Sequence, residues 1–258
     1  MGAKTLGISF LLSVWLAATP AWSLVLKFTT QDFPPFSYEI NGVVSGPAVE
    51  IVQRICAEID ATCSFRLLPW SRAQAQVREG QANGMFVIGW NEKRAKWVHF
   101  TPPVINTEYG IFVNKANVLK YTTLSDIAAY KVGVYGPSNT SNSLEKMRGE
   151  MVRKGYKPIS IDMRPDDESG FKKLALRRLD AVFSNRDVGH ALIAKLGLKD
   201  MIRYSGAQRK LKYYIGFSMA HNDAKVLREF DAAYVQLHKS GAVKAILDKH
   251  GMEVAELE

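Results

Sequence analysis

The sequence predicts an α/β protein built from two lobes, and three observations point to this class. Strand-like and helix-like stretches alternate from residue 24 onward, as expected for a sheet whose strands are connected by helices. The strand-like run at residues 84–89 is continuously apolar, which suits a sheet covered on both faces. The series then restarts near residue 131, so we expect two successive α/β units joined by two crossings around a shared cleft.

The first 23 residues read as an export signal. Lys4 precedes an apolar run that extends through Ala18, and the small residues Ala21 and Ser23 suit cleavage after Ser23. A membrane anchor is the alternative, but about 14 apolar residues is short of the ~20 that a spanning helix needs. We therefore expect a periplasmic protein, and no other stretch of the sequence is apolar enough to cross a bilayer.

The first α/β unit is predicted to alternate regularly. Apolar residues recur at helical spacing in "GPAVEIVQRICAEI", whereas "LVLKFTTQDF" alternates and is rich in β-formers. A helix that starts near residue 71 should end at Gly80 or soon after. The expected strands are residues 24–33, 63–70 and 84–90, and the expected helices are residues 46–59 and 71–82.

The second unit repeats this order with shorter elements. A strand and a short capped helix come first, and the Gly136-Pro137 turn then separates the next strand from a helix. The chain closes with amphipathic helix from residue 222 to residue 250. The expected strands are residues 108–115, 131–135, 181–185 and 210–219, and the expected helices are residues 122–130, 141–155, 168–178 and 186–197.

The two cysteines, Cys56 and Cys63 in "CAEIDATC", are expected to form a disulfide. Thiols exported to an oxidising compartment tend to pair, and a helix end plus a turn can bring the two α-carbons to the ~6 Å that a bridge requires. Free thiols are the alternative. A metal site would need more ligands, and no histidine lies near them in the sequence.

Composition and motifs weigh against several functional classes. The net charge is +9, but basic residues are scattered among acidic ones, which is unlike a nucleic-acid-binding protein and fits a soluble exported one. The sequence has no G-x-S-x-G elbow, H-E-x-x-H pair or phosphate-binding loop. The acidic residues of "RPDDESG" precede a helix, where carboxylates cap free N–H groups. No cofactor or metal is expected.

Two segments suit the binding of a small anion. In "VYGPSNTSNS" a strand ends, and Ser138, Asn139 and Thr140 lead into a helix whose first N–H groups suit a carboxylate or phosphate. An ordinary helix cap, which needs only one of the three, remains the alternative. Arg94 follows the apolar strand at its crevice end, where a guanidinium can hold a carboxylate through two hydrogen bonds. A plain surface charge is the alternative, as for Lys93.

The order of elements resembles the bacterial extracellular solute-binding proteins of family 3, the periplasmic receptors of polar amino-acid importers. The most diagnostic segments are "DFPPFSYEINGVVSGPAVEIVQRI" and "GQANGMFVIGWNEKRAKWVHFTPP", and "LREFDAAYVQLHKSGAVKAILDKHG" closes the pattern. The cysteine spacing is similar to that of a disulfide in the family's basic amino-acid receptors. The resemblance implies a type II periplasmic-binding-protein fold, with lobe 1 at residues 24–112 and 214–258 and lobe 2 at residues 113–213.

The resemblance also implies a function and a set of site residues. We expect a monomeric receptor that captures a small carboxylate-bearing ligand by hinge closure and delivers it to an inner-membrane ABC permease. Arg94 occupies the position of the arginine that grips the ligand α-carboxylate. The other matched positions are the aromatic residues Phe33 and Trp70 and the second-lobe residues Ser138, Asn139 and Thr140.

Two departures from the family pattern put the ligand class in question. Val87 and Gly89 replace the small hydroxyl residues that usually precede the arginine. Asn185 stands where an aspartate normally receives the ligand ammonium, and Asp187 follows two positions later. Loss of that carboxylate removes a charge-assisted hydrogen bond worth about 1.5–3 kcal/mol. A ligand with a carboxylate, an apolar or aromatic body and no obligatory ammonium is therefore as compatible as an α-amino acid.

Two rival functions remain open on the same fold. A periplasmic lyase that resembles cyclohexadienyl dehydratase would need a catalytic acid in the cleft, and Glu39, Glu50 and Asp187 are the carboxyl groups to check. A ligand-sensing partner of a membrane receptor is the other. Neither fold nor composition separates these from a transport receptor.

Overall fold

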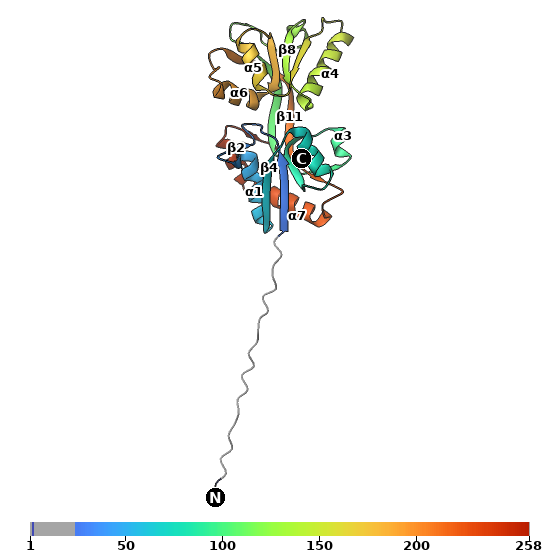
Figure 1. Cartoon of the computed structure of the whole chain (residues 1–258), viewed down its shortest axis with the longest axis vertical. Coiled ribbons are helices and arrows are strands. Elements are labelled where there is room, and N and C mark those ends of the chain that lie inside the picture. Colours follow the sequence, from blue (N-terminus) through green and yellow to red (C-terminus); the bar gives the residue numbers. More distant parts are fainter. Residues whose placement is uncertain (1, 3–23, 258) are drawn as a thin grey trace.

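A computed structural model describes residues 2 and 24–257, so the predicted export signal lies outside the described part of the chain apart from Gly2. Two lobes are stacked along the long axis, and the strands β7 (Ile105–Asn114) and β11 (Ile202–Ser218) run from one lobe into the other (Figure 1). The predicted two-lobe fold with two crossings is confirmed. Among the described helices, none combines the length and the apolar character that a membrane span requires.

Lobe 1 combines elements from both ends of the chain. Helix α1 starts at Pro47, where a missing N–H costs nothing, directly after Gly46. A Cβ at Gly46 would lie 2.6 Å from the Phe36 carbonyl oxygen, so only glycine fits there. The elements of lobe 1 are β1 (Leu24–Thr30), β2 (Tyr38–Ile40), β3 (Val43–Ser45), α1 (Pro47–Glu58), β4 (Ala61–Leu67), α2 (Trp70–Arg78), β5 (Gly84–Gly89), α3 (Glu92–Ala95), β6 (Val98–Phe100), α7 (Ala224–Lys239), α8 (Ala242–Asp248) and β12 (Glu253–Val254).

Lobe 2 is formed by the middle of the chain. Its 3₁₀ helix opens with a capping box in which Thr123 and Asp126 satisfy each other's free backbone N–H groups. The elements of lobe 2 are η1 (Leu124–Ile127), β8 (Lys131–Tyr135), α4 (Asn139–Arg153), β9 (Ser160–Arg164), α5 (Glu168–Ala175), β10 (Ala181–Asn185) and α6 (Arg186–Lys195).

One ten-stranded sheet passes through both lobes in the order β4-β1-β5-β11-β7-β10-β8-β9, with β6 paired to β11 and β12 paired to β7. In lobe 1, β4, β1 and β5 are parallel, and in lobe 2, β10, β8 and β9 are parallel. The crossing strands β7 and β11 pair antiparallel with each other and with their neighbours in both lobes. The parallel strands of each lobe end at the junction between the lobes, where ligands bind in open α/β sheets.

Helices cover both faces of the sheet in each lobe. In lobe 1, Phe28 of β1 packs against Phe230 of α7 in a core that α1, α7 and α8 cover. On the other face, Val77 of α2 and Met85 of β5 belong to a smaller cluster. In lobe 2, α5 and α6 cover one face and α4 covers the other. All six residues of β5 are buried, as the apolar run predicted.

The structure confirms the disulfide and refines several elements. Cys56 on α1 and Cys63 on β4 are bonded, with α-carbons 6.2 Å apart. Strand β11 is longer than predicted because a mixed polar segment, residues 202–209, continues the pairing with β7. The β2–β3 hairpin and β9 were not predicted, since strands of three to five residues are too short for their pattern to stand out. The boundaries between the lobes at residues 112/113 and 213/214 stay a prediction.

Candidate functional site

A small recess of about 30 Å³ lies between the lobes at the inner end of the junction. Both lobes and the crossing strand β11 contribute side chains to it. The residues that line this inner recess are Gln31, Phe33, Trp70, Val87, Gly89, Arg94, Tyr135, Ser138, Asn139, Thr140 and Tyr213. Seven of the eight site residues predicted from the sequence are therefore brought together, and Asn185 is the exception.

Arg94 is the only charged side chain that lines the inner recess, and it is 7% exposed. Its Nη1 donates to the Gly89 carbonyl oxygen at 2.8 Å, and its Nε donates to Gln74 Oε1 at 3.3 Å. The guanidinium carbon lies 5.2 Å from the centre of the Trp70 ring. Its Nη2 has no hydrogen-bond partner among the described residues. Burial lowers the pKa of Arg94 to about 10, so the side chain stays protonated at neutral pH.

The local backbone explains how Arg94 reaches the recess. Strand β5 ends at Gly89, and Asn91 then caps the short helix α3 by accepting a hydrogen bond from the Arg94 backbone N–H at 2.9 Å. Just before this, Val87 adopts a φ of 57°, which is rare for a β-branched residue. The pairing between β5 and β11 shifts at this point, so Val87 forms a bulge that turns the strand end toward the recess.

The wall from lobe 2 is the first turn of α4. Ser138 is its N-cap, with the Ser138 Oγ accepting from the Ser141 backbone N–H at 3.1 Å. The ordinary capping role therefore belongs to Ser138 alone. Asn139 and Thr140 are the next two residues, and both line the inner recess. Their side chains thus face Arg94 from the opposite lobe.

Two hydrogen bonds join the lobes around the recess. Asn91 Nδ2 donates to Asn139 Oδ1 at 3.2 Å, and the Tyr135 hydroxyl donates to Gln31 Oε1 at 3.3 Å. Gly89 allows this close approach, because a Cβ there would lie 3.0 Å from Asn139 Nδ2. The recess is thus closed around Arg94 by direct contacts between the two lobes.

Asn185 does not line the recess, although the sequence placed it in the site. It is 1% exposed and caps α6, with its Oδ1 accepting from the backbone N–H groups of Asp187 and Val188. Its Nδ2 donates to Thr107 Oγ1 at 2.7 Å and to the Tyr213 hydroxyl at 3.2 Å. Tyr213 therefore stands between Asn185 and the recess. The amide oxygen accepts two hydrogen bonds and the amide nitrogen donates two, so neither is free to bind a ligand.

Asp187 does not replace the missing carboxylate. Its Oδ2 accepts from Thr107 Oγ1 at 2.7 Å, and its Oδ1 pairs with Arg186 at 3.2 Å. It lines neither the inner recess nor the larger space beside it. No Asp or Glu is found among the residues that line the inner recess.

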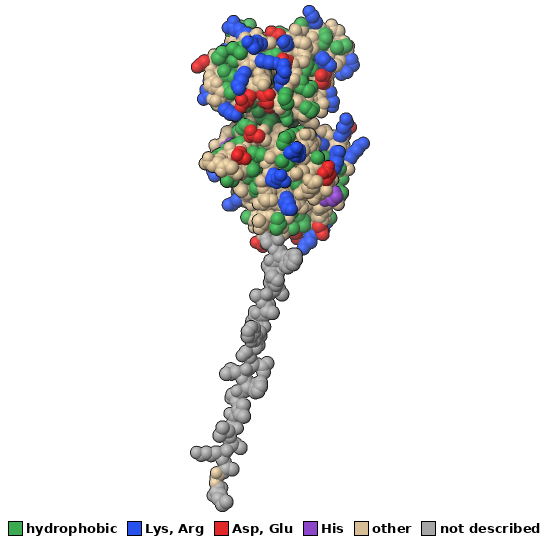
Figure 2. Space-filling view, in the orientation of Figure 1, with side chains coloured by type: hydrophobic (Ala, Val, Ile, Leu, Met, Phe, Trp, Pro, Cys, Tyr) green, Lys and Arg blue, Asp and Glu red, His purple; other side chains and the backbone are tan. Residues whose placement is uncertain are grey.

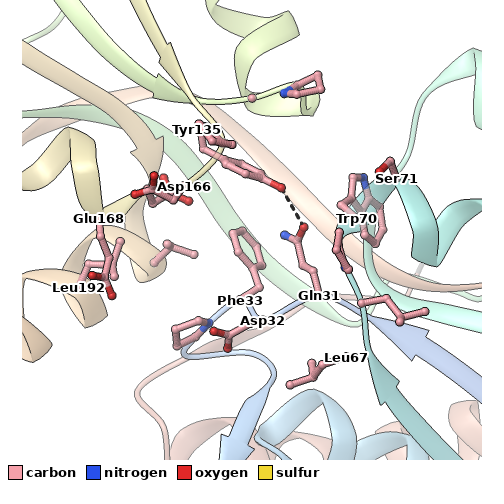
Figure 3. A pocket seen from close by; sticks show the side chains of 18 of the residues that line it. Gln31, Asp32, Phe33, Leu67, Trp70, Ser71, Tyr135, Asp166, Glu168 and Leu192 are labelled. Carbon is pink, nitrogen blue, oxygen red and sulfur yellow. Dashed lines mark hydrogen bonds between the residues drawn. The ribbon is translucent and has the colours of Figure 1, made fainter.

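The inner recess opens beside a larger cavity between the lobes, the outer cleft, with a volume of about 750 Å³. The two spaces share Gln31, Phe33, Trp70 and Tyr135, and Figure 3 shows these side chains with the acidic residues across the cavity. The remaining residues that line the outer cleft are Asp32, Pro34, Leu67, Leu68, Pro69, Ser71, Gly136, Pro137, Pro165, Asp166, Asp167, Glu168, Val188, Leu192 and Lys195.

The outer cleft is acidic where the inner recess is basic. Four carboxyl groups line it, and Lys195, which pairs with Glu168, is its only basic side chain. Burial raises the pKa of Asp167 to about 6, and burial also raises the pKa of Asp32 on the facing lobe. Lys195 partly offsets this rise in the pKa of Asp32, and the carboxyl group of Glu168 adds to it, so charged groups of the two lobes interact electrostatically across the cleft. Figure 2 shows acidic side chains on both lobes beside the waist.

Several of these residues were missed or assigned another role from the sequence. Asp166 does cap the start of α5 as predicted, by accepting from the Ser169 backbone N–H at 2.6 Å. Gln31 and Asp32 directly follow the first parallel strand, and Tyr135 ends another, so their position at strand carboxyl ends was a usable signal. Nothing in the sequence indicated that Tyr213 faces the recess.

Comparison with known sequences gives a consistent result. The sequence profile of the bacterial extracellular solute-binding proteins, family 3, matches residues 26–253. The probable amino-acid-binding protein YxeM of Bacillus subtilis (strain 168) is 26% identical over 233 residues, which cover 89% of this chain and 84% of that protein. The putative ABC transporter arginine-binding protein 2 of Escherichia coli (strain K12) is 24% identical over 243 residues, which cover 91% of this chain and 93% of that protein.

Solved structures share the fold. A histidine kinase sensor domain with similarity to periplasmic binding proteins superposes with a TM-score of 0.77 at 22% identity, covering 91% of this chain and 98% of that one. At this level of identity, the likeness concerns the architecture alone.

Proposed function

The chain belongs to the bacterial extracellular solute-binding proteins, family 3, and from this premise we propose that it is a periplasmic receptor that captures a small carboxylate-bearing solute between its lobes and presents it to an ABC importer. The observation that carries the proposal is Arg94, a buried guanidinium with an unpartnered Nη2, in a recess lined by both lobes. Relatives with amino-acid-binding names in the same family support the solute class.

Closure of the two lobes supplies the mechanism. Trp70 and Arg94 belong to lobe 1, while Asn139 and Thr140 belong to lobe 2, so each lobe provides only part of the contacts. A ligand that touches both parts binds the closed state more tightly than the open one and shifts the population toward it. The strands β7 and β11 are the connections about which the lobes would move. The closed form is the one that a permease would recognise.

The carboxylate is expected to bind Arg94 through Nη2 and the remaining proton of Nη1. Charge-assisted bonds of this kind are about twice as strong as neutral ones, and the buried setting limits competition from water. The hydrogen bonds from Arg94 to Gly89 and Gln74 fix the plane of the guanidinium before the ligand arrives. Little side-chain entropy is then lost on binding.

The three carboxyl groups that the sequence offered as catalysts for a lyase lie outside the site. Glu39, Glu50 and Asp187, the three carboxyl groups considered for catalysis, line neither the inner recess nor the outer cleft. Glu50 lies 4.0 Å from Lys249, and Asp187 is held by Thr107 and Arg186. None of the three is therefore placed to exchange a proton with a ligand held at Arg94.

The test is a ligand screen by thermal shift on the unmodified protein and on Arg94→Ala. Amino acids and other small carboxylates should raise the melting temperature of the unmodified protein, and the substitution should remove that increase. Lys93→Ala is the matched control, because Lys93 is the adjacent, exposed cation on the same short helix. Stabilisation by a carboxylate that survives in Arg94→Ala would refute the proposed site.

A further inference from the structure

We propose that the preferred ligand is an ω-cationic carboxylic acid, in which an ammonium or guanidinium group lies several carbons from the carboxylate and no α-ammonium is required. This inference rests on the proposed function and names the substrate class of the same site. The carboxylate would bind Arg94 in the inner recess, and the cation would reach Asp32 and Asp167 in the outer cleft.

The inner recess offers no counter-charge for an α-ammonium. An α-ammonium is one carbon away from the carboxylate, so it has to be accommodated beside Arg94 when the carboxylate binds there. The recess has no acidic lining residue, and its only charged group is itself a cation. A buried ammonium without a carboxylate partner loses its hydration and gains only neutral acceptors, which is unfavourable.

Asn185 cannot supply the missing acceptor. Its carboxamide oxygen is held by the first two backbone N–H groups of α6, and its nitrogen is directed at the Tyr213 and Thr107 hydroxyls. The side chain that reaches the recess from this direction is Tyr213, whose hydroxyl already accepts from Asn185 Nδ2 and is neutral. The proton of this hydroxyl can be donated to a carboxylate, but an ammonium, which has only donors, gains no charged acceptor here.

The outer cleft provides the counter-charges that the recess lacks. Within the described part of the chain, Asp32 makes no hydrogen bond or close ion pair, and only the more distant Lys195 lowers its pKa. The Asp167 carboxyl group accepts from Ser184 Oγ, at 3.1 Å. Asp32 belongs to lobe 1 and Asp167 to lobe 2, so a cation between them is contacted by both lobes. By contrast, Asp166 is held in the α5 cap and Glu168 by Lys195 and Lys172.

The passage between the two spaces suits an unbranched apolar chain. Phe33 and Trp70 line both the recess and the outer cleft, and so do Gln31 and Tyr135, which bridge the lobes. Aromatic faces on either side of a ligand are good partners for methylene groups. The lining of the two spaces therefore runs from the Arg94 guanidinium, past two aromatic rings, to the carboxyl groups of the outer cleft; Figure 3 shows Phe33 and Trp70 together with Asp32.

The experiment is calorimetric titration of the unmodified protein with matched pairs of compounds. L-arginine is compared with 5-guanidinopentanoate, and L-lysine with 6-aminohexanoate, since each pair differs only in the α-ammonium. The deaminated member should bind at least as tightly as its α-amino partner, and hexanoate, which has no cation, should bind about tenfold more weakly. An α-amino acid that binds about tenfold more tightly than its deaminated partner would overturn the inference.

Two variants give independent readouts. Asn185→Asp keeps a good N-cap for α6, but Tyr213 stands between this position and the recess, so the substitution should leave the affinity for L-arginine relative to 5-guanidinopentanoate unchanged, and an increase of about tenfold would show that position 185 does reach the α-carbon of the ligand. Asp32→Asn combined with Asp167→Asn should weaken 5-guanidinopentanoate and leave hexanoate unchanged, whereas Asp248→Asn, at an exposed position, should change neither. Equal weakening of hexanoate, or no weakening of 5-guanidinopentanoate, would contradict the role of the outer cleft.

The outcomes separate this inference from the proposed function. Binding of α-amino acids that is tight and lost in Arg94→Ala would refute the ligand class while leaving the receptor and its carboxylate site intact. Binding of every carboxylate that is unaffected in Arg94→Ala would refute the proposed function itself.

Discussion

The inner recess and the outer cleft differ in almost every physical respect, although they share four lining residues. The recess is small and contains one buried cation whose orientation is fixed by hydrogen bonds. The outer cleft is about 750 Å³ and is lined by four carboxyl groups, of which Asp32 has no hydrogen-bond partner among the described residues. This contrast suggests that the recess fixes one end of the ligand while the outer cleft selects the other.

Fixing one end has an energetic reason. Arg94 is buried with only neutral partners in the recess, so its charge has lost hydration without gaining an anion. A ligand carboxylate restores that balance, and the gain is specific because the guanidinium does not have to reorganise. The acids of the outer cleft remain closer to solvent, where an interaction with a cation is weaker and more tolerant of ligand length.

The largest expected effect comes from filling the recess. Gly89→Val would place a branched side chain against Asn139 Nδ2, which lies 3.0 Å from the position of a Cβ, and would leave no room for a carboxylate. We expect calorimetry to show a loss of affinity of about 100-fold for any carboxylate, because the full charge-assisted contact is removed.

Gly149→Ala is the control for this substitution. Gly149 lies on α4, and the nearest atom to an added Cβ there is 3.7 Å away. Its affinity should match that of the unmodified protein. Carboxylate binding that is retained in Gly89→Val would show that the ligand does not enter the recess.

A smaller effect is expected from Asp167→Asn, which removes one charge of the outer cleft. The affinity for 5-guanidinopentanoate should fall by about fivefold, because one partly exposed ion pair contributes about 1 kcal/mol. The affinity for hexanoate should not change. Equal losses for both probes would mean that Asp167 supports the shape of the site and does not contact a cation.

The pH dependence should separate the two regions. The pKa of Asp167 is raised to about 6 by burial and by neighbouring Asp166, so a cation beside it binds best above that pH and more weakly as the pH falls through it. The other groups that face this space are Asp32, Glu168, Lys195 and Tyr135. Arg94 stays charged throughout.

Titrations from about pH 8 to about pH 5.5 should therefore show a several-fold loss for 5-guanidinopentanoate and a flat profile for hexanoate. Without ligand, the stability of the protein should change with pH in the opposite direction to the affinity. A carboxyl group with a folded-state pKa above its ordinary 3.8 makes the free energy of unfolding fall as the pH rises from 3.8 to about 6. In Asp167→Asn, both pH dependences should become weaker.

The smallest effect should come from Tyr135→Phe, which removes one of the two hydrogen bonds that join the lobes around the recess among the described residues. A neutral hydrogen bond contributes about 0.5–1.5 kcal/mol, so the affinity should fall by a few-fold through a shift toward the open state. Small-angle X-ray scattering without ligand should give a larger radius of gyration than for the unmodified protein. An unchanged radius together with unchanged affinity would show that this contact does not hold the lobes together.

The sequence predicted the recess better than the outer cleft, and the reason is physical. Arg94 and Ser138 lie at the ends of strongly patterned elements, so the position of each along the chain already places it at the crevice, whereas Trp70 was predicted from the resemblance to the family. Gly89 and Asn139 follow from the same registers. That these residues lie close together could be predicted, because the carboxyl ends of parallel strands meet at one edge of a sheet.

Asn185 and the acids of the outer cleft show where that reasoning stopped. Asn185 also ends a strand, but its amide caps α6 and is covered by Tyr213, and neither relation can be read from spacing. The segment with Asp166 and Asp167 was interpreted as a helix cap, which is correct for Asp166. That Asp167 lines the same cavity as Asp32 of the other lobe depends on how the two lobes meet, and this is a tertiary property.

The most direct test of the central claim, that the ligand carboxylate binds Arg94, is a cycle of four calorimetric titrations. The unmodified protein and Arg94→Ala are each titrated with 5-guanidinopentanoate and with 5-guanidinopentanamide, in which a neutral carboxamide replaces the carboxylate while the guanidinium is kept. Our account predicts that Arg94→Ala weakens the acid strongly and the amide hardly at all, so that the two losses are not additive. Additive losses would contradict it, because they would mean that the carboxylate and Arg94 act at separate places.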